Sequence, residues 1–298
     1  MKIAIIGSGI SGLAAAYYLH KDHDITLFEA EERLGGHTAT VDVEAQGQRY
    51  SIDTGFIVFN DWTYPNFIEL MDEIGVESRQ SDMSFSVSCE RTGLEFAGLD
   101  GKLSLLNGLF AQRSRLFSAS YINLLLDIVR FNKIAVADVE NGHIDHNITL
   151  RDYLIPMASA IWSTPFAQML DFPMRFMLPF MYAHGLLSVS KRPKWRTIVG
   201  GSSQYIAPLS AGFKERIRLA TPVLSVKRFD DHVQITTQGG SERFDQVILA
   251  CHSDQSLSLL KDVSAAERHT LEAIRYQPNE VVLHTDIGQL PRNRRAWA

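Results

Sequence analysis

Three glycines near the N-terminus have the spacing that lets a phosphate group approach the backbone. They are Gly7, Gly9 and Gly12 in the run Gly-Ser-Gly-Ile-Ser-Gly, directly after the apolar residues 2–6. In a strand–turn–helix unit the first glycine permits a tight turn, the second removes a side chain where a pyrophosphate approaches, and the third lets the helix pack closely. The first helical turn, with Ile10 and Ser11, then presents free N–H groups and a positive dipole end. The motif therefore predicts a dinucleotide site.

An acidic residue follows at the position that such a site requires. Residues 24–28 predict a second strand, which ends at Glu29, 22 residues after Gly7. A carboxylate there is suited to accept hydrogen bonds from the adenosine ribose hydroxyls, and it would repel the extra phosphate of NADP. The alternative is a glycine-rich turn beside a solvated Glu. Strand, turn, helix, strand and acid occur in the expected order, which favours the NAD(P)-binding type of Rossmann domain.

The next segment makes the resemblance to a known family specific. After Glu29 and Ala30 comes Arg33-Leu34-Gly35-Gly36-His37-Thr38. A glycine fingerprint, an acid and then Arg-x-Gly-Gly resemble the flavin-containing amine oxidase and phytoene desaturase superfamily, in particular its bacterial predicted FAD-binding oxidoreductases. The resemblance implies an α/β fold with a Rossmann-like FAD-binding domain of the glutathione reductase-like, amine oxidase type. It also implies an interleaved α+β substrate domain and FAD as the cofactor.

The same resemblance nominates the residues that bind FAD. Asp53-Thr54-Gly55-Phe56 is similar to the family's Asp-x-Gly segment beside the flavin, and a valine in the position of Val223 contacts the adenine through its backbone. The expected cofactor-binding set is Gly7, Gly9, Ile10, Ser11, Gly12, Glu29, Ala30, Arg33, Gly35, Gly36, His37, Thr38, Gly55, Phe56 and Val223. His37 stands where the family usually has Arg, so this contact is in question, and an imidazole there could make it pH-dependent. The alternative for His37 is a polar surface loop.

The pattern of elements predicts a chain that passes twice between two domains. We expect the FAD-binding domain in residues 1–80 and 195–262, and the substrate domain in residues 81–194 and 263–298. Alternation around short turns predicts hairpins over 40–52, 84–96 and 233–245. Leucine periodicity predicts helix over 103–136, and Thr149 with Asp152 suggests an N-cap before Tyr153. Residues 278–286 read as a strand that returns to the substrate domain.

The most apolar stretch allows two interpretations. Residues 167–187 contain four methionines together with Phe172, Phe176 and Phe180, whose spacing of four would place three rings on one helical face. Pro173, Pro179 and two charged residues argue against a membrane span. One interpretation is a core helix, kinked at proline. The other is an adaptable wall of an apolar substrate tunnel, because Met and Phe fit irregular hydrocarbon ligands.

Two other groups of polar residues are weaker candidates for chemistry. His143 and His146 lie in a local turn signal at residues 141–146, which favours a solvated loop over a metal site. Cys251 and His252 are adjacent at the end of a predicted strand, where neighbouring side chains point to opposite faces. We therefore expect structural roles there and no Cys–His pair. No pattern in the sequence assigns a catalytic base, and none predicts a metal.

The composition of the chain limits the classes of partner that we expect for the protein. The 298 residues carry a net charge of −5, and 45% of them are hydrophobic. This balance disfavours a general binder of nucleic acid or of anionic membranes. The two cysteines fit a reducing compartment, and no signal peptide precedes the first predicted strand, so we expect a cytoplasmic protein. We expect no membrane span, and peripheral membrane contact stays open.

The resemblance implies an FAD-dependent oxidoreductase that removes a hydride from a C–N or C–C bond of a small, apolar substrate. The first alternative is a flavin-dependent isomerase or saturase of unsaturated lipids. The second is a non-catalytic protein on the same fold, as in Rab GDP-dissociation inhibitors, and an NAD dehydrogenase is a weaker third. The family also carries a glycine-rich motif under the flavin ring and a final helix. The 298 residues of this sequence contain no match to that C-terminal segment, so we expect a C-terminally truncated chain.

Overall fold

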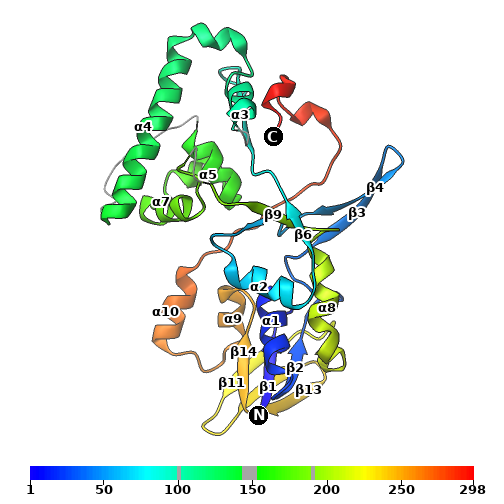
Figure 1. Cartoon of the computed structure of the whole chain (residues 1–298). Helices are drawn as coiled ribbons and strands as arrows, with labels where there is room; N and C mark the ends of the chain where they lie inside the picture. The colour runs from blue at the N-terminus through cyan, green and yellow to red at the C-terminus, as the bar shows by residue number, and fades with distance from the viewer. Residues whose placement is uncertain (99–101, 143–152, 189–191) are drawn as a thin grey trace. The chain divides into compact units, whose positions relative to one another are not determined.

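A computed structural model of the chain describes residues 1–98, 102–142, 153–188 and 192–298 (Figure 1). The chain divides into two compact units, each built from segments far apart in the sequence. Unit 1 comprises Met1–Ile57, Phe67–Arg79 and Thr197–Val281. Unit 2 comprises Val58–Asn66, Gln80–Arg196 and Val282–Ala298. Each unit holds its own hydrophobic core.

A parallel sheet organises unit 1 and confirms the expected Rossmann-like architecture. Its strands run in the order β10 (Ile217–Arg218), β2 (Asp24–Phe28), β1 (Lys2–Ile6) and β14 (Gln246–Leu249). β1 pairs in parallel with β2 on one side and with β14 on the other. Such a sheet is buried on both faces, which explains why β1 and β2 are almost continuously apolar. The carboxyl ends of these strands therefore meet at one edge of the sheet.

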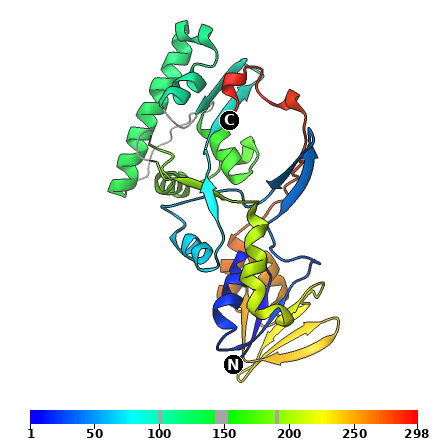
Figure 2. The same cartoon turned by 45° about the vertical axis from the view of Figure 1, so that its right-hand side comes forward.

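The two faces of this sheet are covered by different elements. Side chains of β1 alternate, so Ala4 and Ile6 share one face. They pack with Phe28 against an antiparallel meander of β11 (Ser225–Arg228), β12 (Val233–Thr237) and β13 (Gly240–Phe244). Helix α1 (Ile10–Leu19) packs against β1 and β2, with Leu13 and Ala16 fully buried (Figure 2). The predicted hairpin over 233–245 is thus part of this meander.

Unit 1 also contains a separate hairpin, several helices and two 3-10 turns. The hairpin expected over 40–52 forms as β3 (Thr40–Ala45) and β4 (Gln48–Asp53). The helices are α2 (Pro65–Glu73), α8 (Ile206–Ser210), α9 (Ser253–Leu259) and α10 (Ala265–Ala273), and the 3-10 turns are η2 (Ser202–Tyr205) and η3 (Ala211–Arg216). The chain passes between the units in β6 (Ser78–Gln80) and in β9 (Trp195–Ile198).

Unit 2 is built mainly from helices around one hairpin. The hairpin expected over 84–96 forms as β7 (Phe85–Cys89) and β8 (Leu94–Gly98). The helices are α3 (Lys102–Leu109), α4 (Ala119–Asn141), α5 (Leu154–Trp162), α6 (Phe166–Met169) and α7 (Met174–Ala183), with 3-10 turns η1 (Arg113–Phe117), η4 (Ile287–Gln289) and η5 (Arg294–Ala296). The short strand β5 (Phe59–Asn60) pairs antiparallel with β9.

One helix predicted in unit 2 is divided into two helices in the structure. The helix expected over 103–136 is interrupted between α3 and α4, because tertiary contacts hold the intervening turn. The Gln112 side chain donates to the Gly93 carbonyl at 2.7 Å, and Arg115 donates to the Thr92 carbonyl at 2.8 Å. These bonds to the β7–β8 turn override local helix propensity. The suggested N-cap at Thr149 and the histidines at 143 and 146 lie outside the described residues.

The apolar stretch over 167–187 belongs to the core of unit 2, as the first interpretation expected. It forms α6 and α7, separated near Pro173, and Met169, Met177 and Met181 are buried together with residues of α4 and α5. The three phenylalanines do not share one apolar face. Phe172 and Phe180 both contact the Trp162 ring, whereas the Phe176 side chain is 60% exposed. The break at Pro173 removes Phe172 from the helix and with it the expected alignment.

The strand expected over 278–286 is absent from the described structure. Val281 and Val282 are 64% and 67% exposed, and Pro278 lacks the N–H group that a ladder needs. A strand without a neighbour leaves its backbone groups unpaired, so the pattern alone does not form one. Helix α10 falls in unit 1, whereas the predicted boundaries place it in the substrate domain. Arg228 of β11 explains this, because it pairs with Glu267 of α10 at 2.5 Å.

The assignment of unit 1 to cofactor binding and unit 2 to substrate binding stays a prediction. Within the described residues, no helix is both long enough and apolar enough to cross a membrane.

Candidate functional site

The glycine turn after β1 has the geometry that the motif predicts. Gly7 has φ +103°, and a Cβ there would lie 2.7 Å from the Ala250 carbonyl oxygen, so only glycine fits. A Cβ at Gly12 would lie 1.9 Å from the Gly7 carbonyl oxygen, which means that α1 packs directly on the turn. A Cβ at Gly9, in contrast, would meet nothing within 4 Å. Gly9 therefore faces open space in front of α1.

The start of α1 provides donors toward that space. Gly9 is the N-cap residue, and among the described side chains none hydrogen-bonds to this end of the helix. The first N–H groups of a helix lack partners within the helix, and they carry the positive end of its dipole. Ile10 is half-buried and Ser11 is exposed at this end. The arrangement can bind an anion, as the sequence predicts.

Glu29 is tied to the glycine turn. Its Oε2 accepts the Ser8 N–H at 2.9 Å and the Ser8 hydroxyl, and its Oε1 accepts the Glu31 N–H at 2.9 Å. The side chain is buried at the carboxyl end of β2. A carboxylate has about four acceptor positions, so these three bonds leave room for a ribose hydroxyl. Glu29 thus organises the turn in addition to its expected role. The exposed Ala30 follows it directly.

The second glycine pair lies against the first turn. The Gly35 N–H donates to the Ser8 carbonyl at 3.1 Å, and a Cβ at Gly36 would lie 3.2 Å from the Gly9 Cα atom. Arg33 donates to the Gly36 and Thr38 carbonyls at 3.0 and 3.2 Å. Arg33, which the sequence predicts in the cofactor-binding set, therefore also has a structural role, because its guanidinium bridges two carbonyls of the loop that contains Gly35 and Gly36.

Stacked aromatic rings hold His37 beside the strand end of β14. The His37 ring stacks on His252 with centroids 5.1 Å apart, and His252 stacks on Tyr276 at 4.3 Å. His37 itself is exposed. Cys251 contacts the Ser256 hydroxyl at 3.3 Å, so Cys251 and His252 have separate partners. The stacking places His252 and Tyr276 beside the predicted site, a relationship for which the sequence has no signal.

A hydrogen-bond network positions the Asp53–Phe56 segment. Asp53 accepts the Thr40 hydroxyl at 2.6 Å and the Ser202 N–H at 2.9 Å, and the Ser202 hydroxyl bonds the Phe56 carbonyl at 2.6 Å. A Cβ at Gly55 would lie 2.0 Å from the His37 carbonyl oxygen. The absence of a side chain at Gly55 therefore lets this segment pack against the backbone of the His37 loop.

Two further residues of the expected set have their own partners. Thr38 is buried and hydrogen-bonds the Tyr205 hydroxyl. Val223 is half-buried against the core under the meander. The Thr221 N–H donates to the Glu29 carbonyl at 2.8 Å, which brings the Val223 segment to the end of β2. Glu29 and the Gly35–Gly36 loop thus meet at Ser8, after the carboxyl end of β1, and Gly55 joins them through the His37 backbone.

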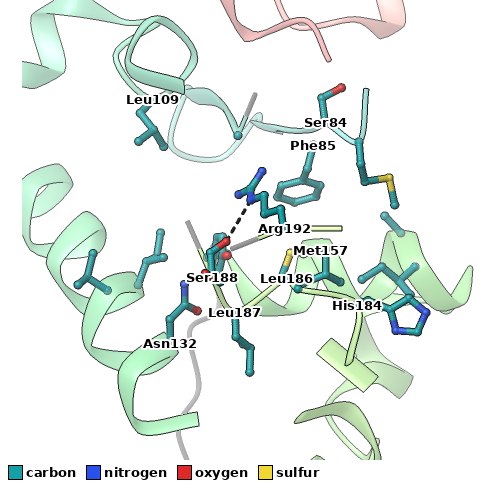
Figure 3. Close-up of a pocket in the computed structure, with 18 of the residues that line it drawn as sticks. Ser84, Phe85, Leu109, Asn132, Met157, His184, Leu186, Leu187, Ser188 and Arg192 are labelled. Carbon is teal, nitrogen blue, oxygen red and sulfur yellow. Dashed lines mark hydrogen bonds between the residues drawn. The ribbon is translucent and has the colours of Figure 1, made fainter. Parts of the chain in front are cut away.

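Unit 2 contains a cavity of about 630 Å³ (Figure 3). Its walls are mostly aliphatic and aromatic, and one face of α4 contributes Leu125, Ile128, Val129, Asn132, Lys133 and Val136. Met157 of α5 lines it, whereas the buried methionines of α6 and α7 do not. Of residues 167–187, only the last four line the cavity, among them Leu186 and Leu187. The methionines and phenylalanines on which the tunnel-wall interpretation rested do not line it. The volume lies within the usual range for small-molecule sites.

His184 lines the same cavity and has a defined orientation. Its Nδ1 lies 2.8 Å from the Phe180 carbonyl oxygen, which can only accept, so Nδ1 carries the proton of this bond. The ring stacks on Phe180 with centroids 3.9 Å apart. Figure 3 shows His184 on the side of the cavity away from Asn132 and Ser188. The sequence offered no pattern that would single out this histidine.

Comparison with known proteins identifies the chain's relatives. The family model described as flavin containing amine oxidoreductase matches residues 10–285. The chain is 25% identical over 255 residues to amine oxidase [flavin-containing] A of Canis lupus familiaris, which is 79% of this chain and 46% of that protein. It is 58% identical over 53 residues to prenylcysteine oxidase 1 of Homo sapiens, 16% of this chain and 10% of that protein.

A solved structure supports the fold. Cyclohexylamine oxidase from Brevibacterium oxydans IH-35A superposes with a TM-score of 0.63 at 18% identity, over 91% of this chain and 62% of that one. The chain thus spans less than two thirds of the length of these relatives.

Proposed function

The chain belongs to the family of flavin-containing amine oxidoreductases, whose cofactor is FAD, and from this premise we propose its activity. We propose an FAD-dependent oxidoreductase that removes a hydride from a C–N or C–C bond of a small hydrophobic substrate. The gathering of the glycine turn, Glu29 and the Gly35–Gly36 loop around Ser8 is the observation that carries the proposal. When bound, the flavin supplies the acceptor for the hydride.

The residues of unit 1 fit the cofactor. The open space at Gly9 and the uncapped start of α1 suit a pyrophosphate, because they combine close backbone approach with free N–H donors. The remaining acceptor capacity of Glu29 suits the ribose hydroxyls. The Gly35–Gly36 loop, held by Arg33, and His37 complete the predicted binding surface. We propose that these residues bind and orient FAD, and we assign the role of catalytic base to none of them.

The cavity of unit 2 supports a hydrophobic substrate. Its walls include Phe85, Phe96, Leu125, Val136 and Met157, with few polar side chains among them. Burying apolar surface against such walls contributes about 25 cal/mol per Å², so a hydrocarbon substrate gains more there than a small polar amine.

Flavin content and anaerobic reduction test the proposal. The purified protein should be yellow, and FAD should be recovered from it after denaturation. Unsaturated lipids and hydrophobic amines should then be added without oxygen, and bleaching of the flavin by one of them is the expected result. A protein that takes up no FAD would overturn the proposal and support a non-catalytic role.

A flavin-dependent isomerase or saturase is the second candidate, and the apolar cavity favours it to the same degree. Product analysis separates these activities, because an isomerase leaves the oxidation state of the lipid unchanged, a saturase reduces the lipid and an oxidoreductase that removes a hydride oxidises it. A shifted double bond without consumption of an electron acceptor would replace the oxidoreductase proposal.

A further inference from the structure

The cavity of unit 2 has a polar end that its apolar walls do not explain. The Asn132 Oδ1 atom is buried and has no hydrogen-bond partner among the described residues. Burial raises the pKa of the neighbouring Tyr153, and the Arg192 guanidinium and a hydrogen bond from Asn132 partly oppose that rise. Arg192 also donates to the Ser188 carbonyl at 3.0 Å (Figure 3). Asn132, Tyr153, Ser188 and Arg192 thus form one polar corner, which we call the head-group corner.

This corner disfavours a ligand made only of hydrocarbon. A polyene that filled the cavity would cover the Asn132 oxygen without offering a donor, and an unsatisfied buried acceptor costs about 1–3 kcal/mol. A ligand with a polar end, or a water held between that end and Asn132, removes this cost. The cavity therefore favours an amphipathic molecule over a purely apolar one.

The charged side chains that line the cavity favour one kind of polar group on the ligand over another. Lys133 and Arg192 line it, and none of the lining residues that the structure describes is acidic. Both side chains are exposed, so their electrostatic effect on a bound ligand is screened by salt. An alkylammonium ion would meet the like charge of Lys133 there, and none of the described lining residues would offer it a carboxylate. A carboxylate would find the Lys133 ammonium and also the Arg192 guanidinium, which already donates to the Ser188 carbonyl.

We infer that the cavity binds a single-chain amphipathic carboxylate of the fatty-acid type. The hydrocarbon chain of this ligand lies along the apolar face of α4, and its carboxylate lies at the head-group corner toward Lys133 and Arg192. A water that donates one hydrogen to Asn132 Oδ1 and the other to the carboxylate satisfies both acceptors. The inference rests on the proposed function and deepens it, because it names the substrate class as an acid rather than an amine.

Three ligands with the same hydrocarbon chain test the inference. Oleate, oleyl alcohol and oleylamine should be titrated into the FAD-loaded protein at pH 7, below their aggregation limits, with displacement of a fluorescent fatty acid as the readout. We expect oleate to bind roughly tenfold more tightly than oleylamine, with the alcohol between them. The advantage of oleate should shrink as salt is raised.

Charge reversal on α4 sharpens the test. Lys133→Glu should weaken oleate binding roughly tenfold and strengthen oleylamine binding, while the alcohol changes little. Arg130→Glu is the matched control, because Arg130 lies on the same helix, pairs with Asp127 at 3.1 Å and does not line the cavity. Ala160→Phe should weaken all three ligands, because Ala160 lines the cavity from α5 and is exposed enough to accept a larger side chain.

The outcomes separate the inference from the proposed function. Equal binding of the three ligands, or tighter binding of oleylamine, would overturn the carboxylate assignment and leave a hydrophobic substrate intact. Binding of none of them by an FAD-loaded protein would overturn the inference and leave the proposed FAD-dependent activity to be tested with other substrates. Binding only to vesicles of an anionic phospholipid, insensitive to Ala160→Phe, would place the lipid on the surface and overturn the cavity site.

Discussion

Glu29 and Ser8 form a buried pair in which one carboxylate oxygen accepts both the backbone N–H and the hydroxyl of the serine. This pair fastens the glycine turn to the end of β2. It gives Glu29 a role in the protein before any cofactor binds, so changes at this position affect stability and binding together.

Replacement of Glu29 should reveal both roles. Glu29→Gln places an amide group where Oε2 accepts from Ser8, so a buried donor loses its partner, and the free energy of unfolding should fall by about 1–3 kcal/mol. FAD binding should weaken in addition. Ser8→Ala is the control, because it removes the hydroxyl and keeps the N–H bond. Denaturant unfolding with and without FAD measures both effects. Unchanged stability in Glu29→Gln would contradict the hydrogen bonds described here.

The glycines of the turn should separate folding from binding. Gly9→Val should fold, because a side chain there meets nothing within 4 Å, yet it should lose FAD because the branched side chain occupies the pyrophosphate position. Gly12→Ala should fold poorly, since its Cβ would stand 1.9 Å from the Gly7 carbonyl oxygen. Circular dichroism and flavin content distinguish the two results. Full flavin retention in Gly9→Val would show that the cofactor binds elsewhere.

The position of His37 should accept arginine, the residue that the family usually has there. His37→Arg should keep or improve FAD affinity, because a guanidinium also stacks on a flat ring and supplies more donors. His252→Ala should weaken FAD binding by a factor of a few, because His37 loses the ring at 5.1 Å that orients it. Equilibrium binding of FAD to both variants tests this. A folded His37→Arg protein that binds FAD far more weakly would show that the loop does not contact the cofactor.

Replacement of Met181 tests whether the methionines of α7 stabilise the core of unit 2 or contact a ligand in the cavity. The side chain is completely buried, and it does not line the cavity of unit 2. Met181→Ala should lower the free energy of unfolding by about 2–5 kcal/mol and leave the affinity for oleate unchanged. The half-buried Met174 offers a comparison, since Met174→Ala should cost less. A large loss of ligand affinity in a folded Met181→Ala protein would restore the methionines as part of the tunnel wall.

The attachment of α10 should depend on pH. Hydrogen bonds from Arg228 and Ser264 lower the pKa of Glu267 to about 2. Because the pKa is lowered on folding, the carboxylate stabilises the fold above its ordinary pKa of 4.5, and this contribution is lost as the pH falls through about 2. Arg228→Gln should raise the Glu267 pKa toward its ordinary range. NMR titration of the glutamate side chain measures the shift, and an unmoved pKa would contradict the pairing.

Much of unit 1 was predictable because its signals are local. The run of β-branched residues in β1, the glycines at 7, 9 and 12 and the acid at the end of β2 each follow from backbone geometry over a few residues. The hairpins β3–β4 and β7–β8 were predictable for the same reason. The dinucleotide site followed from these motifs, because a pyrophosphate imposes a fixed glycine spacing on the chain. The family and FAD were implied by the resemblance that the Arg33–Gly36 segment adds to them.

Tertiary structure decided the features that depend on distant partners. The strand expected over 278–286 has no neighbour to pair with in the described structure, and the helix expected over 103–136 is broken by bonds to the β7–β8 turn. The methionines of α6 and α7 became core because other helices bury them. The partner of His37, the orphaned oxygen of Asn132 and the cations around the cavity depend on which elements meet. Periodicity reports which face of an element is apolar, but only packing determines what that face contacts.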